Sequence, residues 1–192
     1  LGIFVADISF LGNKIPTTGE TILGESYNIG PGGKGCNQAI AISRLGEKVN
    51  FISKLGDDDY GKLAIDKLKK DKVDTSNIII SKKHKTGVAG IHVDRNTGKN
   101  AITVVRGAPS SLTIEEIDVK VFKKSKIFLT QLEIPIEVTL HCLKAAKNYG
   151  LLNILNPAPA CKLTNDFFNL VDYFTPNETE AEFYTGVKIK DE

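Results

Sequence analysis

From residue 124 onward, short apolar runs alternate with helical segments, and this order constrains the fold more than any other feature of the chain. The runs KSKIFLTQLE (124–133) and LLNILNP (151–157) are typical of buried strands, and PIEVTLHCLKAAKNYG (135–150) between them is typical of a helix. The stretch DYFTPNETEAEFYTG (172–186) adds a strand and a helix that begins near Asn177. Because strands that alternate with helices pair in parallel, we predict an α/β fold whose mostly parallel central sheet is covered by helices on both faces.

The first half of the chain contains two further pairs of a strand and a helix. IFVADIS (3–9) and KVNFISKLG (48–56) are predicted strands. KGCNQAIAISRLG (34–46) and DDYGKLAIDKLKKDKV (58–73) are predicted helices, and the lysine-rich face of the second one is expected to be solvated.

Between these two halves the sequence pattern changes from alternating strands and helices to two consecutive β-strands. TGVAGIHVD (86–94) and KNAITVVRG (99–107) flank an Asn-Thr-Gly turn, which predicts a β-hairpin. Because side chains alternate along a strand, Ala89 and Ile91 share one face. A two-stranded ribbon needs a partner to be stable, and LGNKIPTTGETILGES (11–26) is the candidate.

Composition argues against several classes of function. The formal net charge is +2 over 192 residues, and no long run of Lys and Arg lies beside aromatic residues, so no nucleic-acid partner is expected. No apolar run approaches the roughly 20 residues of a membrane span and no signal segment opens the chain, so we expect no membrane contact and a cytoplasmic location.

Cys36, Cys142 and Cys161 lack C-x-x-C spacing, which predicts free thiols. The chain starts inside a predicted strand and stops just after a predicted helix, so we expect it to be part of a longer polypeptide.

The stretch YNIGPGGKGCNQA (27–39) contains Gly30-x-Gly32-x-x-Gly35, the spacing of a dinucleotide-binding loop. Such a loop requires a buried strand that leads directly into the glycines, whereas the approach here is polar and interrupted by Pro31, so we expect no strand there. A P-loop is disfavoured as well, because Gly35 stands where a Ser or Thr would contact Mg²⁺.

The remaining interpretation of this loop is a site for a small polar ligand at the start of a helix. Gly32 and Gly33 let the backbone approach a ligand closely, and Lys34 and Asn37 add side-chain donors. These groups can bind a polyhydroxylated molecule as well as a phosphate. A glycine-rich connector that binds nothing is the structural alternative.

Four motifs in order resemble the PfkB sugar kinase family, and its ribokinase branch in particular. They are TTGETILGESYNIGPGGKGCNQAIAISRLG (17–46), TQLEIP (130–135), LNPAPA (155–160) and TPNETEAEFYTG (175–186). The resemblance covers nearly the whole chain and implies a ribokinase-like αβα sandwich with a small β-ribbon lid. Under it, residues 1–10, 25–85 and 106–192 form an incomplete sugar kinase core, and residues 11–24 and 86–105 form the lid.

The resemblance also assigns roles to individual residues. The sugar-binding set is Asp7, Gly32, Gly33, Lys34, Asn37, Ala89, Ile91 and Glu133. Asn177 is assigned to the nucleotide phosphates and Glu180 to a metal, where it would order Mg²⁺. Taken out of this context, Asp7 would be a polar cap at a strand end, and Asn177 with Glu180 would be an ordinary helix cap.

The activity implied by the resemblance is transfer of the ATP γ-phosphoryl group to O5 of D-ribose. It implies Mg²⁺, a monovalent cation such as K⁺ in the full-length enzyme, and a homodimer formed through the lid. The family's general base lies in a Gly-Ala-Gly-Asp loop that these residues lack, so we expect it beyond Glu192 and expect no turnover by this segment alone. Val5 stands where ribokinases usually carry an asparagine, and Gly107-Ala108-Pro109 replaces a Gly-Ala-Asn.

Other functions are compatible with these motifs. A fructokinase, an adenosine kinase or a pseudouridine kinase shares most of them. A non-catalytic sugar-binding module would keep the sugar loop and the lid without the kinase half. A dinucleotide-dependent oxidoreductase is the remaining alternative, and it would bind NAD.

Overall fold

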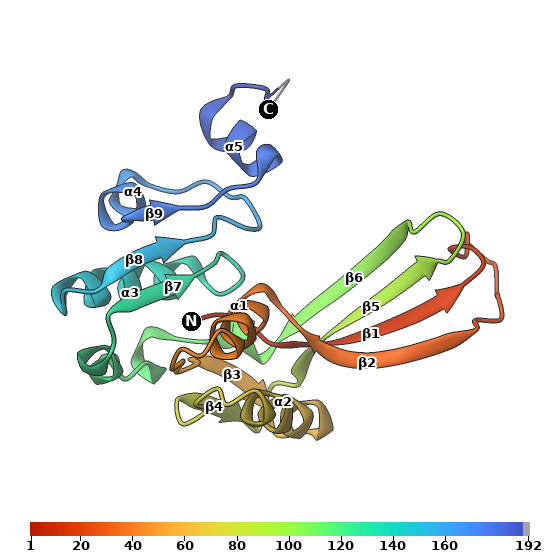
Figure 1. The fold of residues 1–192 in the computed structure, drawn as a ribbon, viewed down its shortest axis with the longest axis horizontal. Helices are drawn as coiled ribbons and strands as arrows, with labels where there is room; N and C mark the ends of the chain where they lie inside the picture. Colours follow the sequence, from red (N-terminus) through yellow and green to blue (C-terminus); the bar gives the residue numbers. More distant parts are fainter. Residues whose placement is uncertain (190–192) are drawn as a thin grey trace. The chain divides into compact units, whose positions relative to one another are not determined.

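The computed structural model describes residues 1–189 of the chain (Figure 1). It divides into two compact units. Residues 3–109 form the N-terminal unit, and residues 1–2 together with residues from 110 onward form the C-terminal unit. No helix of the described residues is both long enough and apolar enough to span a bilayer.

The N-terminal unit contains a four-stranded sheet in the order β2-β1-β5-β6. Its strands are β1 (Val5–Gly12), β2 (Ser26–Gly32), β5 (Thr86–Asp94) and β6 (Asn100–Gly107). Strand β1 pairs in antiparallel fashion with β2 and in parallel fashion with β5. The predicted hairpin is confirmed as β5 and β6. Its partner was predicted within residues 11–26; the strand that pairs with it is β1, of which only Leu11 and Gly12 fall in that range.

Strand β2 corrects the expectation that the polar stretch before the glycines forms no strand. Ser26–Gly32 is a strand despite Pro31, which lies opposite Ala6 of β1. β2 is an edge strand, and a proline is tolerated there because one side of an edge strand needs no hydrogen-bonded partner. A strand therefore does lead into the glycine loop, although it is an antiparallel edge strand rather than the buried parallel strand of a dinucleotide fold.

A second, two-stranded sheet and two helices complete the N-terminal unit. β3 (Ser53–Gly56) pairs in parallel with β4 (Ile78–Ser81). The helices are α1 (Lys34–Arg44) and α2 (Asp59–Lys70), as predicted within a few residues. The hydrophobic core of the unit includes Phe4, Ala6, Cys36, Ala39, Ile40, Phe51, Leu55, Ala64, Leu68 and Val73.

The C-terminal unit has the predicted parallel β-α-β order. Its sheet, β7-β8-β9, consists of Ile127–Thr130, Leu152–Leu155 and Tyr173–Phe174, and both pairings are parallel. The α-helices are α3 (Ile136–Asn148), α4 (Asn165–Leu170) and α5 (Glu178–Thr185). Three short 3₁₀ helices, η1 (Ala108–Ser111), η2 (Ile114–Glu116) and η3 (Val119–Lys124), were not predicted. Cys36, Cys142 and Cys161 are free, as predicted.

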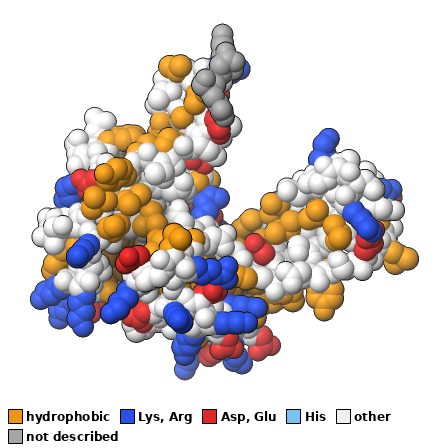
Figure 2. Space-filling view, viewed as in Figure 1, with side chains coloured by type: hydrophobic (Ala, Val, Ile, Leu, Met, Phe, Trp, Pro, Cys, Tyr) orange, Lys and Arg blue, Asp and Glu red, His pale blue; other side chains and the backbone are white. Residues whose placement is uncertain are grey.

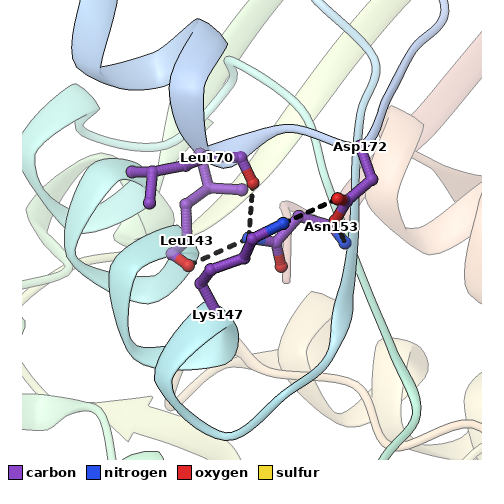
Figure 3. Close-up of polar contacts among 5 residues, drawn as sticks. All are labelled: Leu143, Lys147, Asn153, Leu170 and Asp172. Atoms are coloured by element: carbon purple, nitrogen blue, oxygen red, sulfur yellow. Dashed lines mark hydrogen bonds and ion pairs between the residues drawn. The ribbon is translucent and has the colours of Figure 1, made fainter.

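Asn153 of β8 ties the helices of the C-terminal unit to its sheet (Figure 3). The side chain is fully buried, and its Nδ2 donates to the carbonyl oxygens of Leu143 on α3 and Leu170 at the end of α4, each at 2.9 Å. The backbone N–H of Asn153 donates to Oδ2 of Asp172 at 2.8 Å, and Lys147 Nζ donates to the other oxygen of this carboxylate at 2.6 Å. The side-chain amide of Asn153 therefore links α3 to α4, and its backbone N–H holds Asp172, which immediately precedes β9.

Replacing Asn153 by Ala should lower the free energy of unfolding by about 2–3 kcal/mol, because two hydrogen bonds are lost and a buried cavity is left. Asn156 offers a matched control on the same strand segment, since its Nδ2 makes one exposed hydrogen bond to the Thr175 carbonyl. Asn156→Ala should cost about 0.5–1 kcal/mol. Urea unfolding of both variants measures the difference, and equal costs would contradict the role of Asn153.

Candidate functional site

The carboxylate of Asp7 lies directly against the backbone of Gly32. Residues 5 and 7 of β1 point to the same face of the sheet, and Gly32 of β2 lies opposite Val5. A Cβ atom added at Gly32 would lie 2.1 Å from Oδ1 of Asp7. Only a glycine therefore leaves room for this position of the carboxylate.

Helix α1 begins immediately after this contact. Gly33 is its N-cap with a φ of 90°, and a Cβ there would lie 2.6 Å from the carbonyl oxygen of Ile3. Within the described residues, no side chain caps the helix, and its first turn contains no acidic residue. The positive end of the helix dipole and backbone N–H donors therefore lie at the same place as the Asp7–Gly32 contact.

Lys34 and Asn37 lie on the first turn of α1. They are three positions apart, so they are neighbours on one side of the helix, and both are exposed. Lys34 directly follows Gly33, and the backbone N–H of Asn37 donates to the Gly33 carbonyl oxygen at 2.9 Å. The structure thus brings the predicted donors to the same helix terminus as the glycines.

Strand β5 supplies the apolar part of this region. Ala89 is the parallel partner of Asp7, and Ile91 is the partner of Ser9, so both lie on the Asp7 face of the sheet. Ala89 is buried and Ile91 is half-buried. A carboxylate beside small apolar side chains can accept hydrogen bonds from hydroxyl groups while the apolar surface contacts carbon atoms.

The side-chain carboxylate of Asp7 makes no hydrogen bond or ion pair with any residue that the structure describes. Burial raises the pKa of its carboxyl group. The Asp7 charge also acts on the buried thiol of Cys36. Burial is the larger cause and the Asp7 charge the next, and together they raise the pKa of this thiol to about 12. A half-buried carboxylate that no protein donor satisfies has a desolvation cost, so the environment of Asp7 differs from that of a structural carboxylate held by hydrogen bonds.

In the C-terminal unit, three polar residues follow three parallel strands. Glu133 follows β7, Asn156 follows β8 and Asn177 follows β9. The C-terminal ends of parallel strands meet at one edge of a sheet, which is where open α/β sheets bind ligands. Asn156 was not predicted as a site residue. Its position after a predicted strand, like those of Glu133 and Asn177, could have indicated it.

Asn177 and Glu180 form a capping box at the start of α5. Asn177 Oδ1 accepts from the Glu180 N–H at 2.8 Å, and Glu180 Oε2 accepts from the Asn177 N–H at 2.9 Å. Glu180 is buried, whereas Asn177 is exposed. Among residues 1–189, no group of three or more His, Cys, Asp or Glu side chains could hold a metal ion.

The predicted residues therefore fall into two sets. Asp7, Gly32, Gly33, Lys34, Asn37, Ala89 and Ile91 belong to the N-terminal unit, and Glu133, Asn177 and Glu180 belong to the C-terminal unit. Within the first set, the arrangement provides an anionic acceptor, backbone donors and apolar surface. These features fit a polyhydroxylated ligand better than a phosphate, because the partnerless Asp7 carboxylate would repel an anion.

A family model described as pfkB family carbohydrate kinase matches residues 1–192. The ribokinase of Haemophilus influenzae is 40% identical over 177 residues, which cover 91% of this chain and 57% of that protein. The deoxyribokinase of Salmonella typhi is 35% identical over 192 residues, which cover 98% of this chain and 62% of that protein. The chain thus spans about three fifths of the length of these relatives.

The fold is also similar to that of solved structures. The structure of Arabidopsis thaliana ribokinase complexed with ribose and ATP matches with a TM-score of 0.87 at 29% sequence identity. The match covers 99% of this chain and 62% of that chain. The predicted ribokinase-like α/β fold is therefore confirmed.

The raised pKa of Asp7 predicts an unusual pH dependence for Asp7→Asn. Because the folded state binds the proton more tightly, the free energy of unfolding of the wild type falls as pH rises from the unfolded pKa, about 3.9, through the higher folded pKa. Asparagine does not ionise, so Asp7→Asn has no such loss of stability. We expect it to be more stable than the wild type at pH 7 and to lose the advantage below about pH 4.

Asp74→Asn is the matched control in the same unit. Hydrogen bonds from the Ser76 backbone and from Asn50 lower the pKa of Asp74, so its contribution to stability is present at neutral pH and is lost as pH falls through the lowered folded pKa. This control should therefore be less stable than the wild type at pH 7. Urea unfolding at pH 4 and pH 7 compares the two variants, and a destabilised Asp7→Asn at pH 7 would contradict the assignment.

Proposed function

Because the chain belongs to the pfkB family of carbohydrate kinases, we propose that the full-length protein transfers the γ-phosphoryl group of ATP to O5 of D-ribose. The observation that carries the proposal is the half-buried Asp7 carboxylate, which lies against Gly32 and has no partner among the described residues. Adjacent hydroxyl groups of a sugar are donors that fit such an acceptor. A hydrogen bond to a charged group contributes about 1.5–3 kcal/mol.

The residues around Asp7 would orient the sugar. Backbone groups at Gly32 and Gly33 and the side chains of Lys34 and Asn37 would bind its remaining oxygens. Ala89 and Ile91 would cover an apolar face of the sugar as part of a lid made of residues 11–24 and 86–105, with the rest of the chain as the kinase core. Such a lid would exclude water, which otherwise competes as the phosphoryl acceptor.

The C-terminal set would serve the sugar and the nucleotide. Glu133 is proposed to accept from a sugar hydroxyl, and Asn177 to donate its side-chain amide to a phosphate, since its Oδ1 already accepts from Glu180. One oxygen of Glu180 is engaged by the capping box, so its other oxygen suits a hydrated Mg²⁺, contacted through water. Bound Mg²⁺ would neutralise phosphate charge. Of the other expected groups, the base is proposed to lie in the remainder of the protein, and we also propose a K⁺ site there.

A homodimer through the lid is part of the proposal. The four-stranded sheet exposes large hydrophobic side chains, which Figure 2 shows along its visible face. By the strand register, Ile102 and Val104 lie on the Asp7 face of the sheet, whereas the opposite face carries Phe10, Tyr27, Ile29 and Val105. An exposed apolar surface of this kind is typical of a protein interface.

A second candidate substrate is 2-deoxy-D-ribose. Val5 lies on the same face as Asp7 and opposite Gly32, so this part of the β1 surface offers no hydrogen bond from a side chain. A hydroxyl group placed there would lose its partner, whereas a deoxy carbon would not. The similarity to the deoxyribokinase of Salmonella typhi supports keeping this sugar in the test.

The test is ADP release by the full-length protein with D-ribose, 2-deoxy-D-ribose, D-fructose, adenosine and pseudouridine. We expect kcat/KM to be highest for D-ribose by about tenfold or more. Residues 1–192 alone should give no turnover. A preference for 2-deoxy-D-ribose would select the second candidate, and sugar binding without ADP release would indicate a non-catalytic module.

The contact between the Asp7 carboxylate and Gly32, called here the Asp7 cradle, can be tested with a matched pair of variants. In Gly32→Ala, the new Cβ collides with the end of a flexible side chain, so the chain should fold but the carboxylate must move. The KM for the sugar should rise roughly 10- to 100-fold, which corresponds to one hydrogen bond to a charged group. In Gly30→Ala, the nearest atom to the new Cβ is Asn28 Nδ2 at 3.6 Å, so KM should stay near that of the wild type. Equal KM values for the two variants would rule out the cradle.

A further inference from the structure

The carboxylate of Asp58 binds two different elements of the N-terminal unit. Its Oδ1 accepts from the Gly61 N–H at 2.9 Å, which makes Asp58 the N-cap of α2. Its Oδ2 accepts from the Thr86 N–H at 2.8 Å, and Thr86 is the first residue of β5. One side chain therefore fixes the start of a helix and the start of the strand that carries Ala89.

Strand β3 is the third element that contacts this region, through its last residue, Gly56. The Thr86 side chain, which is buried, accepts through Oγ1 from the N–H of Gly56 at the end of β3, at 2.9 Å. Helix α2 packs directly on this strand end, since a Cβ at Gly61 would lie 2.1 Å from the Gly56 carbonyl oxygen. The end of β3, the start of α2 and the start of β5 thus form one hydrogen-bonded junction.

The electrostatics agree with a carboxylate held by these donors. Burial alone would raise the pKa of Asp58, but hydrogen bonds from Thr86 and Gly61 outweigh it and hold the pKa below the usual range. Asp58 is therefore charged and doubly engaged at neutral pH. This is the opposite of Asp7, whose carboxylate has no such donors.

The junction matters for the site because of the register of β5. Gly87, the residue after Thr86, pairs with Val5, and Ala89 pairs with Asp7. A slip of one residue would turn Ala89 and Ile91 to the opposite face of the sheet. The position of Thr86 therefore determines which side chains of β5 lie beside Asp7.

We propose that Asp58 is a positioning residue for the sugar site, which acts by holding the start of β5 through Thr86. It touches no ligand. It keeps Ala89 and Ile91 in place beside Asp7, and so acts on sugar binding rather than on nucleotide binding. The sugar readout rests on the proposed function, whereas the position of β5 can be measured without it.

Asp58→Asn separates this role from helix capping. Asparagine caps a helix about as well as aspartate, so the bond from Gly61 can be kept through the remaining oxygen. The side-chain NH₂ group then faces the Thr86 N–H, and two donors cannot bond to each other. The variant therefore keeps the cap and loses the link to β5.

In the full-length protein, Asp58→Asn should raise the KM for the sugar about fivefold or more and leave the KM for ATP within about twofold. Thr86→Val should do the same, because it removes the acceptor for Gly56, whereas Thr86→Ser keeps the hydroxyl and should behave like the wild type. Asp74→Asn is the control: it disturbs comparable hydrogen bonds in the same unit, but Asp74 accepts from Ser76 and Asn50 rather than from β5, so both KM values should stay unchanged.

Amide hydrogen exchange across residues 86–94 provides the second readout. Exchange should be faster in Asp58→Asn than in Asp74→Asn at equal distance below their unfolding temperatures. If the wild type phosphorylates no sugar, the proposed function fails, and exchange alone decides the role of Asp58. Equal exchange in the two variants, or a sugar KM that is unchanged in Asp58→Asn, overturns the inference.

Discussion

Strand β1 is paired on both sides, and the candidate site depends on this double pairing. On one side Gly32 lies opposite Val5, which places a residue without a side chain under the Asp7 carboxylate. On the other side Ala89, far along the chain, lies beside Asp7. Because side chains alternate along strands, a shift in either register would remove one wall of the site. The two registers must therefore be fixed by contacts outside the site.

The sequence predicts the parts of this fold that have local signatures. The β-α-β order after residue 124, the hairpin at residues 86–107 and the helix that begins at Lys34 follow from periodicity and turn residues. Strand β2 was not predicted because a proline such as Pro31 is incompatible with a central strand. The local sequence does not show that this strand lies at the edge of the sheet, where a proline is tolerated. The link from Asp58 to Thr86 spans 28 residues and has no local pattern at all.

The capping box of α5 shows why a motif can be predicted while its role cannot. The spacing of Asn177 and Glu180 satisfies the start of a helix, and the hydrogen bonds of that cap are present. The same geometry leaves the Asn177 amide group exposed at the C-terminal end of β9, where ligands bind in parallel sheets. Capping uses Oδ1 of Asn177, whereas the proposed phosphate contact would use its NH₂ group, so the presence of the cap does not decide against the proposed role.

Two aspartates of the N-terminal unit illustrate how environment separates structural groups from binding groups. Asp58 is surrounded by donors that lower its pKa, so its charge stabilises the folded state. Asp7 is desolvated without donors, so its charge costs stability, and the chain nevertheless keeps Gly32 beneath it where any larger residue would push it away. A cost of this kind persists when a ligand offsets it. No described side chain of the unit supplies the donors that Asp7 lacks, and the hydroxyl groups of the proposed sugar would supply them.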